Sequence, residues 1–119
     1  MSVKNIKANR VELDLGGVKY KLSFDMGMGM ELAEKYGSVK EAFEVFDSVI
    51  KDQFSLTKIQ LELISDLIYL FTGSVIEDRA GILKLLNMKN LAGILLTIGQ
   101  AITGNLPEAE EGSGPPQKP

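Results

Sequence analysis

The sequence VKYKLSFDMGMGMELAEKYGSVKEAF, residues 18–43, begins with the hydrophobic periodicity of a strand and continues with that of a helix. Its first residues alternate between apolar and polar side chains, which predicts a strand whose apolar face holds Val18, Tyr20, Leu22 and Phe24. Residues 10–15, RVELDL, alternate in the same way, and the Gly16-Gly17 pair between the two runs supplies the positive φ angles of a tight turn. We therefore predict a β-hairpin over residues 10–24. A lone hairpin is only marginally stable in water, so other elements have to cover its apolar face.

The same stretch then predicts a helix from Met26 to Tyr36. Asp25 stands at the N-cap position, where its carboxylate accepts hydrogen bonds from free helix amides, and Gly37 is a typical residue just after a helix. Gly27 and Gly29 are unusual inside a helix, where each costs about 1 kcal/mol relative to alanine. They indicate either a frayed first turn or the close approach of another backbone. The apolar residues at helical spacing are Met26, Met30 and Ala33.

Two longer helices are predicted next. Ser38 opens the first, with Glu41 in position to complete a capping box, and Ser55 or Thr57 caps the second. The second helix carries more apolar residues than a surface helix needs, so we expect it to lie at the centre of the fold. Its apolar positions are Ile59, Leu63, Ile64, Leu67, Ile68, Leu70 and Phe71.

A short helical segment over 77–86 and one more helix complete the pattern. Asn87 or Asn90 caps the last helix, which continues to about Thr103 and is stopped by Gly104. The fold class is therefore α+β and mainly α, with an N-terminal β-hairpin packed on a bundle of four to five helices.

The chain divides into three parts by composition. Residues 1–9 are polar and basic and predict a flexible lead-in without the apolar core of a signal peptide. Residues 10–104 form a single domain, with the hairpin in 10–24 and helices in 25–104. Residues 105–119 are acidic and rich in Gly and Pro, which predicts a disordered tail.

Absent residue types exclude most enzyme chemistry. The 119 residues contain no Cys and no His, which removes thiolate metal sites, Ser-His-Asp triads and Cys-His pairs. The carboxylate pairs Glu12 with Asp14 and Glu31 with Glu34 fall at positions that should face solvent. A net charge of −3 lacks the basic excess of nucleic-acid-binding proteins. We therefore expect a protein that is not an enzyme, with no catalytic residues, metal, cofactor or nucleic-acid partner.

The last predicted helix is apolar on more than one side. Leu91, Ile94, Leu95, Ile98 and Ile102 form one stripe, which is typical of a core-facing surface. A second line of small or apolar residues is formed by Ala92, Leu96, Gly99 and Thr103. The helix is too short to cross a membrane, so the second line is either buried within the monomer or faces a partner. The methionines Met26, Met28 and Met30 form another adaptable apolar cluster. Together, the second line and these methionines are the candidate partner-binding residues.

Four sequence runs resemble the tail assembly chaperones of long-tailed, siphovirus-like bacteriophages. GGVKYKLSFDM (16–26) and MELAEKYGSVKEAF (30–43) are similar to the strand and helix end, of the kind GGKEYKLKFD and ELEEKYGS, with which those small proteins often begin. ISDLIYLF (64–71) and NLAGILLTIGQAI (90–102) are similar to the family's later helices. The resemblance covers residues 11–103 and departs from the family's regular helix start at Gly27 and Gly29.

The resemblance implies a non-catalytic role in virion morphogenesis in the cytoplasm of the bacterial host. Such chaperones bind the helical tape measure protein, keep it soluble and help tail tube subunits assemble around it, and they are not retained in the virion. Apolar helices often self-associate, so we also expect a homo-oligomer. One alternative is a structural or adaptor subunit of a phage tail or similar particle, which uses the hairpin edge for strand addition. Another is a small enzyme that works through carboxylates.

Overall fold

The computed structural model describes residues 11–104. Strands β1 (Glu12–Leu15) and β2 (Val18–Lys21) pair antiparallel, with Leu15 opposite Val18. Gly16 and Gly17 have φ angles of 64° and 86°, which confirms the glycine turn and the predicted hairpin. The predicted flexible lead-in over 1–9 and the predicted disordered tail over 105–119 lie outside the described residues.

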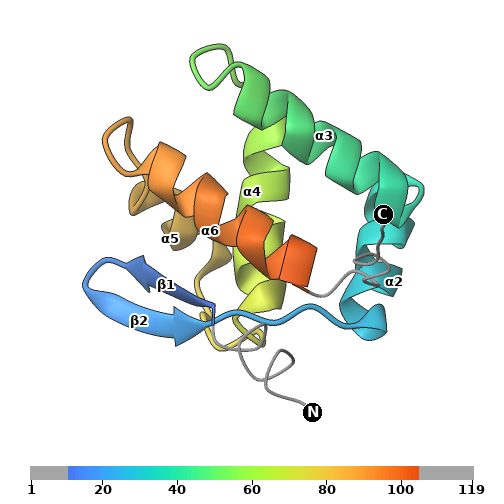
Figure 1. Cartoon of the computed structure of the whole chain (residues 1–119), viewed down its shortest axis with the longest axis horizontal. Helices are drawn as coiled ribbons and strands as arrows, with labels where there is room; N and C mark the ends of the chain where they lie inside the picture. Colours follow the sequence, from blue (N-terminus) through green and yellow to red (C-terminus); the bar gives the residue numbers. More distant parts are fainter. Residues whose placement is uncertain (1–10, 105–119) are drawn as a thin grey trace, which may run out of the picture.

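Five helices follow the hairpin in the described part of the chain, which confirms the predicted fold class. Figure 1 shows α4 at the centre, α6 crossing in front of it, and α2 and α3 on the side away from the hairpin. The helices are α2 (Met26–Tyr36), α3 (Val39–Lys51), α4 (Lys58–Phe71), α5 (Arg79–Lys84) and α6 (Leu91–Gly104). No helix in this part is both long and apolar enough to cross a bilayer.

The second strand is less buried than its alternation predicts. Val18 is exposed and Tyr20 is half-buried, although both were expected on the covered face. The reason is that α6 packs on β1, which leaves β2 as the outer strand (Figure 1). Leu22 and Phe24 are buried as expected, but they follow the strand and enter the core from an extended segment.

The first three described helices begin at N-cap residues that the sequence predicts. Asp25 Oδ1 accepts a hydrogen bond from the Met28 amide at 2.9 Å, and Ser38 Oγ accepts one from the Glu41 amide at 3.0 Å. A complete capping box is found at Thr57, whose side chain and backbone exchange hydrogen bonds with Gln60, so Thr57 rather than Ser55 caps α4. These bonds satisfy amides that a helix leaves without intrahelical partners.

Both candidate caps of the last helix are used together. Asn87 Oδ1 accepts from the Asn90 amide at 2.9 Å, and Asn90 Oδ1 accepts from the Asn87 amide at 2.8 Å. The Asn87 carbonyl also accepts a hydrogen bond from the Leu91 amide, so the helical hydrogen bonding starts at this residue. Reciprocal bonding of this kind satisfies two backbone amides ahead of α6, as a capping box does.

The buried face of α2 contains a glycine. Gly29 and Leu32 are buried, whereas Met26 and Met30 are 76% and 65% exposed. A Cβ atom at Gly29 would lie 3.3 Å from a Val39 methyl group, so the missing side chain lets α2 approach α3 closely. The close approach that the glycines predict is therefore found at Gly29, where the neighbour is a side chain rather than another backbone.

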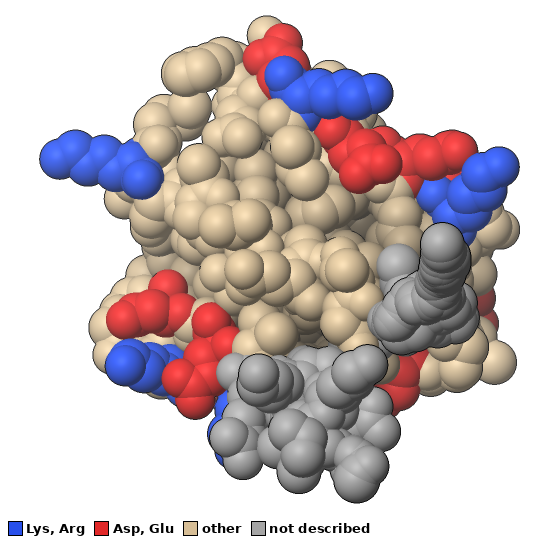
Figure 2. Space-filling view, in the orientation of Figure 1, with Lys and Arg blue, Asp and Glu red and all other residues tan. Residues whose placement is uncertain are grey.

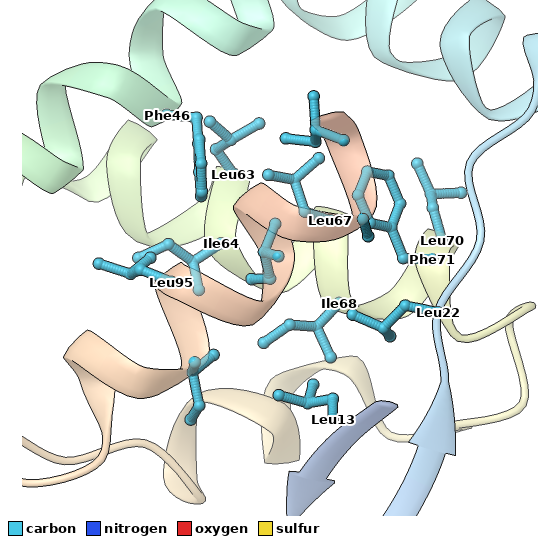
Figure 3. Close-up of a cluster of buried hydrophobic side chains, with 14 of the residues drawn as sticks. Leu13, Leu22, Phe46, Leu63, Ile64, Leu67, Ile68, Leu70, Phe71 and Leu95 are labelled. Atoms are coloured by element: carbon cyan, nitrogen blue, oxygen red, sulfur yellow. The ribbon is translucent and has the colours of Figure 1, made fainter. Parts of the chain in front are cut away.

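The core is built around α4, as its apolar content predicts. Figure 3 shows Leu67, Ile68 and Phe71 of α4 among side chains from the hairpin, α3 and α6. The Phe24 ring lies 5.4 Å from the Phe71 ring, and the Ser23 amide donates to the Phe71 carbonyl at 2.9 Å. The buried apolar residues of α4 are Leu63, Ile64, Leu67, Ile68, Leu70 and Phe71.

Candidate functional site

An apolar groove of about 600 Å³ lies between α3 and α6. We call it the α3–α6 groove. It is lined by Phe43, Phe46, Asp47, Ile50, Leu95, Leu96, Gly99, Gln100, Ile102, Thr103 and Gly104. Most of these side chains are apolar, as in sites that bind hydrophobic groups or helices.

The groove exists because α6 turns only one of its two apolar faces into the core. Leu91, Ile94 and Ile98 on the first face are buried, while Leu96 on the other face is 64% exposed. Helix α6 contains no charged residue from Leu91 to Gly104. Figure 2 shows the result, an uncharged central surface over α6 with Lys, Arg, Asp and Glu at its margin. An exposed apolar surface of this kind is typical of an interaction site.

Three of the four predicted residues on the second line of α6 line the groove. They are Leu96, Gly99 and Thr103, and Thr103 Oγ1 donates to the Gly99 carbonyl at 2.8 Å. Ala92 is exposed but lies outside the groove lining. This face of α6 is open, so the second line is not fully buried within the described part of the monomer.

The opposite wall comes from α3, which the sequence did not indicate as part of a site. Phe43, Phe46 and Ile50 recur every three or four residues along α3, so they share one face of the helix. Phe46 is indeed buried, but Phe43 is half-buried and Ile50 is exposed. The apolar face of α3 is therefore wider than the core needs. This excess of apolar residues was the feature of the sequence that could have predicted the groove wall.

The three predicted methionines do not form one surface. Met26 and Met30 are exposed on α2, while Met28 is half-buried and packs against the core. None of the three lines the α3–α6 groove. Their role in partner binding stays a prediction, now confined to the exposed pair Met26 and Met30.

A second feature, which is polar and which the sequence did not indicate, is centred on Asp66 of α4. Its side chain is only 7% exposed and accepts hydrogen bonds from Lys35 Nζ at 2.8 Å and Tyr36 Oη at 2.7 Å. Arg79 also donates to the second carboxylate oxygen and stacks over the Tyr69 ring at 4.3 Å. These contacts join α2, α4 and α5. The aspartate within the apolar run of α4 could have predicted this cluster, because a buried carboxylate requires hydrogen-bond or ion-pair partners.

The electrostatics of this cluster favour a structural role over proton transfer. Burial raises the pKa of the Tyr36 hydroxyl, and the hydrogen bond to Asp66 raises it further. Tyr36 therefore stays protonated and keeps donating at neutral pH. Asp66 has its oxygens occupied by three donors, two of them cationic, which leaves it poorly placed to act as a base. By contrast, the carboxylates of Glu12 and Glu31 are exposed, as predicted.

The α3–α6 groove is therefore the candidate functional site, because it is open, apolar and lined by three predicted residues. Within residues 11–104, no group of three or more Asp and Glu side chains is arranged to hold a metal ion. No family model, curated protein or solved structure matches the chain.

Proposed function

We propose that this chain is a non-enzymatic tail assembly chaperone of a long-tailed bacteriophage. It binds the tape measure protein in the cytoplasm of the bacterial host, keeps it soluble, promotes assembly of tail tube subunits around it and is not retained in the virion. The observation that carries the proposal is the α3–α6 groove, an open apolar surface beside a charge-free helix. The resemblance over residues 11–103 supplies the identity of the client.

The groove suits a helical client on physical grounds. An amphipathic helix binds by laying its apolar stripe into a hydrophobic groove, with anchors one turn apart. Leu96 offers an exposed side chain at the groove, and Phe43 and Ile50 face it from α3. Covering such apolar surface contributes about 25 cal/mol per Å² removed from water. A client helix held in this way would have its apolar stripe covered, so it could not aggregate with other client molecules through that stripe.

The alternative role as a structural or adaptor subunit has one observation in its favour. Strand β2 pairs only with β1 among the described strands, so its outer edge is open to strand addition. However, Lys19 and Lys21 are exposed on this strand, and charged side chains on an edge strand usually discourage pairing. Detection of the protein in purified particles would favour this alternative, because a chaperone leaves the particle.

Leu96→Glu is expected to abolish the chaperone activity without unfolding the chain. The side chain is mostly exposed, so the fold tolerates the change, but a carboxylate in an apolar interface costs several kcal/mol of binding. The test is co-expression with a tape measure protein encoded near this gene, with the soluble fraction of the client as the readout. Wild type should raise that fraction, and Leu96→Glu should return it to the level without chaperone.

Val75→Glu is the matched control, because Val75 is also exposed and lies outside the groove. It should solubilise the client as wild type does. An insoluble client in the presence of wild type, together with empty pull-downs of neighbouring gene products, would contradict the proposed function. We also propose that the chain forms a homo-oligomer, which sedimentation at increasing concentration tests.

Gly99→Ala is expected to raise the stability of the chain and to weaken its binding to the client. A Cβ atom at this position would lie 3.9 Å from Phe46 Cε2, an ordinary contact distance, so the fold can accept it. Replacing a helical glycine with alanine should stabilise the chain by about 1 kcal/mol. The same methyl group narrows the α3–α6 groove, so client binding should weaken severalfold.

Gly93→Ala provides the comparison within the same helix. Nothing lies within 4 Å of a Cβ atom there, and Gly93 is outside the groove lining. It should raise the stability measured by urea denaturation by a similar amount. The amount of client recovered in pull-downs should be the same as for wild type. Equal binding by both variants would show that the client does not approach α6 at Gly99.

A further inference from the structure

Asp47 is the single ionisable residue among those that line the α3–α6 groove. It lies on α3 between Phe43 and Ile50, four residues after one and three before the other, so all three share a helix face. Its carboxylate is exposed and has no hydrogen-bond or ion-pair partner within residues 11–104. Glu44 on the same helix, by contrast, pairs with Lys40 at 4.0 Å. Among the described residues, Asp47 is therefore a negative charge without a partner, beside an apolar surface.

We propose that the partner helix of this groove carries a lysine or arginine that meets Asp47, beside an aliphatic stripe that contacts Leu96 and Ile50. This inference rests on the proposed function and specifies the chemistry of the client. Charge complementarity at the margin of an interface fixes register and speeds association, while the apolar stripe supplies most of the affinity. A basic residue one turn from the stripe reaches Asp47 when the stripe lies in the groove.

The charges argue against two occupants from this chain itself. A second copy that docks through α6 brings no cation to Asp47, because Leu91–Gly104 contains no charged residue. The segment 105–119 carries Glu108, Glu110 and Glu111 and has few apolar residues, so its first half would repel Asp47 and fill the groove poorly. A separate basic amphipathic helix fits both the apolar lining and the free carboxylate.

The test uses the full chain and two synthetic helical peptides of about 20 residues, which span roughly 30 Å. Both carry the same leucine stripe, and they differ only at the flanking position, which is lysine in one and glutamate in the other. Fluorescence anisotropy at low and high salt gives the affinity of each peptide. We expect wild type to prefer the lysine peptide by about fivefold at low salt, as for a partly exposed ion pair.

Three variants make the result specific. Asp47→Asn should remove the preference, Asp47→Lys should reverse it, and Glu77→Lys, an equal charge change at an exposed site outside the groove, should preserve it. Leu96→Glu should weaken binding of both peptides. Since Asp47 is exposed and has no partner within residues 11–104, none of its variants is expected to disturb folding, which circular dichroism checks.

The outcomes separate this inference from the function on which it rests. Equal binding of both peptides by wild type and the Asp47 variants, with loss in Leu96→Glu, overturns the basic-partner inference and leaves the groove as the client site. Failure of wild type to bind either peptide also overturns it, and the client solubility assay then decides independently on the chaperone function. Self-association that Asp47→Lys abolishes would assign the groove to a second copy and would overturn the inference as well.

Discussion

Phe71→Ala is expected to lower the free energy of unfolding by about 3–5 kcal/mol, the usual cost of truncating a buried aromatic side chain. Phe71 is fully buried at the end of α4, and its ring packs at a tilt against Phe24 with centroids 5.4 Å apart. The loss combines the apolar surface of the ring, the cavity that remains and the aromatic contact. Because small domains are stable by only about 5–15 kcal/mol, this change removes a large share of the total.

Phe54→Ala is the matched control, since Phe54 is 85% exposed in the connection between α3 and α4. Surface substitutions of this kind change stability by about 0.5 kcal/mol or less. Urea denaturation followed by circular dichroism measures both variants. Similar transition midpoints for Phe71→Ala and Phe54→Ala would contradict the placement of Phe71 at the centre of the core.

Asp66→Asn is expected to destabilise the chain by about 2–3 kcal/mol, somewhat less than the 3–5 kcal/mol for breaking a buried ion pair. The carboxylate is buried and accepts from Lys35, Tyr36 and Arg79, so an amide in its place removes the charge that strengthens all three hydrogen bonds. The cost stays below the full range because the Lys35 and Arg79 side chains are nearly half exposed, and water can solvate them.

Two further variants calibrate this prediction. Tyr36→Phe removes a single hydrogen bond and should cost about 1 kcal/mol. Glu62→Gln changes a more exposed carboxylate that lies 3.7 Å from Lys35, and its effect should be about 0.5 kcal/mol or less. Urea denaturation at neutral pH gives all three values. If Asp66→Asn and Glu62→Gln cost the same, the Asp66 cluster does not hold α2, α4 and α5 together.

Local signals in the sequence were sufficient for the hairpin turn and for several helix caps. The turn at Gly16-Gly17, the caps at Asp25 and Thr57 and the stop at Gly37 each depend on residues no more than four positions apart. Such contacts are formed within a single element, so the residue types alone predict them. Hydrophobic content likewise placed α4 at the centre, because a helix with so many apolar side chains has to be enclosed.

Features that depend on how elements meet were not predictable in the same way. The inward face of α2 was set by the approach of Val39 to Gly29, although Met26 and Met30 are more hydrophobic than glycine. Asp66 contacts Lys35 and Tyr36 across about thirty positions, and no spacing rule connects them. The α3–α6 groove needed the relative position of two helices, so sequence indicated only the α6 wall.

The packing of α6 on β1 has a consequence for how the chain folds. The first strand of the described structure is covered by its last helix, with most of the sequence between them. Contacts of such high sequence separation require closure of a long loop, which slows folding relative to local helix pairing. During synthesis the apolar side of the hairpin also stays uncovered by α6 until the ribosome has released that helix. Folding of this small, largely helical protein is therefore completed only when its C-terminal helix reaches its N-terminal hairpin.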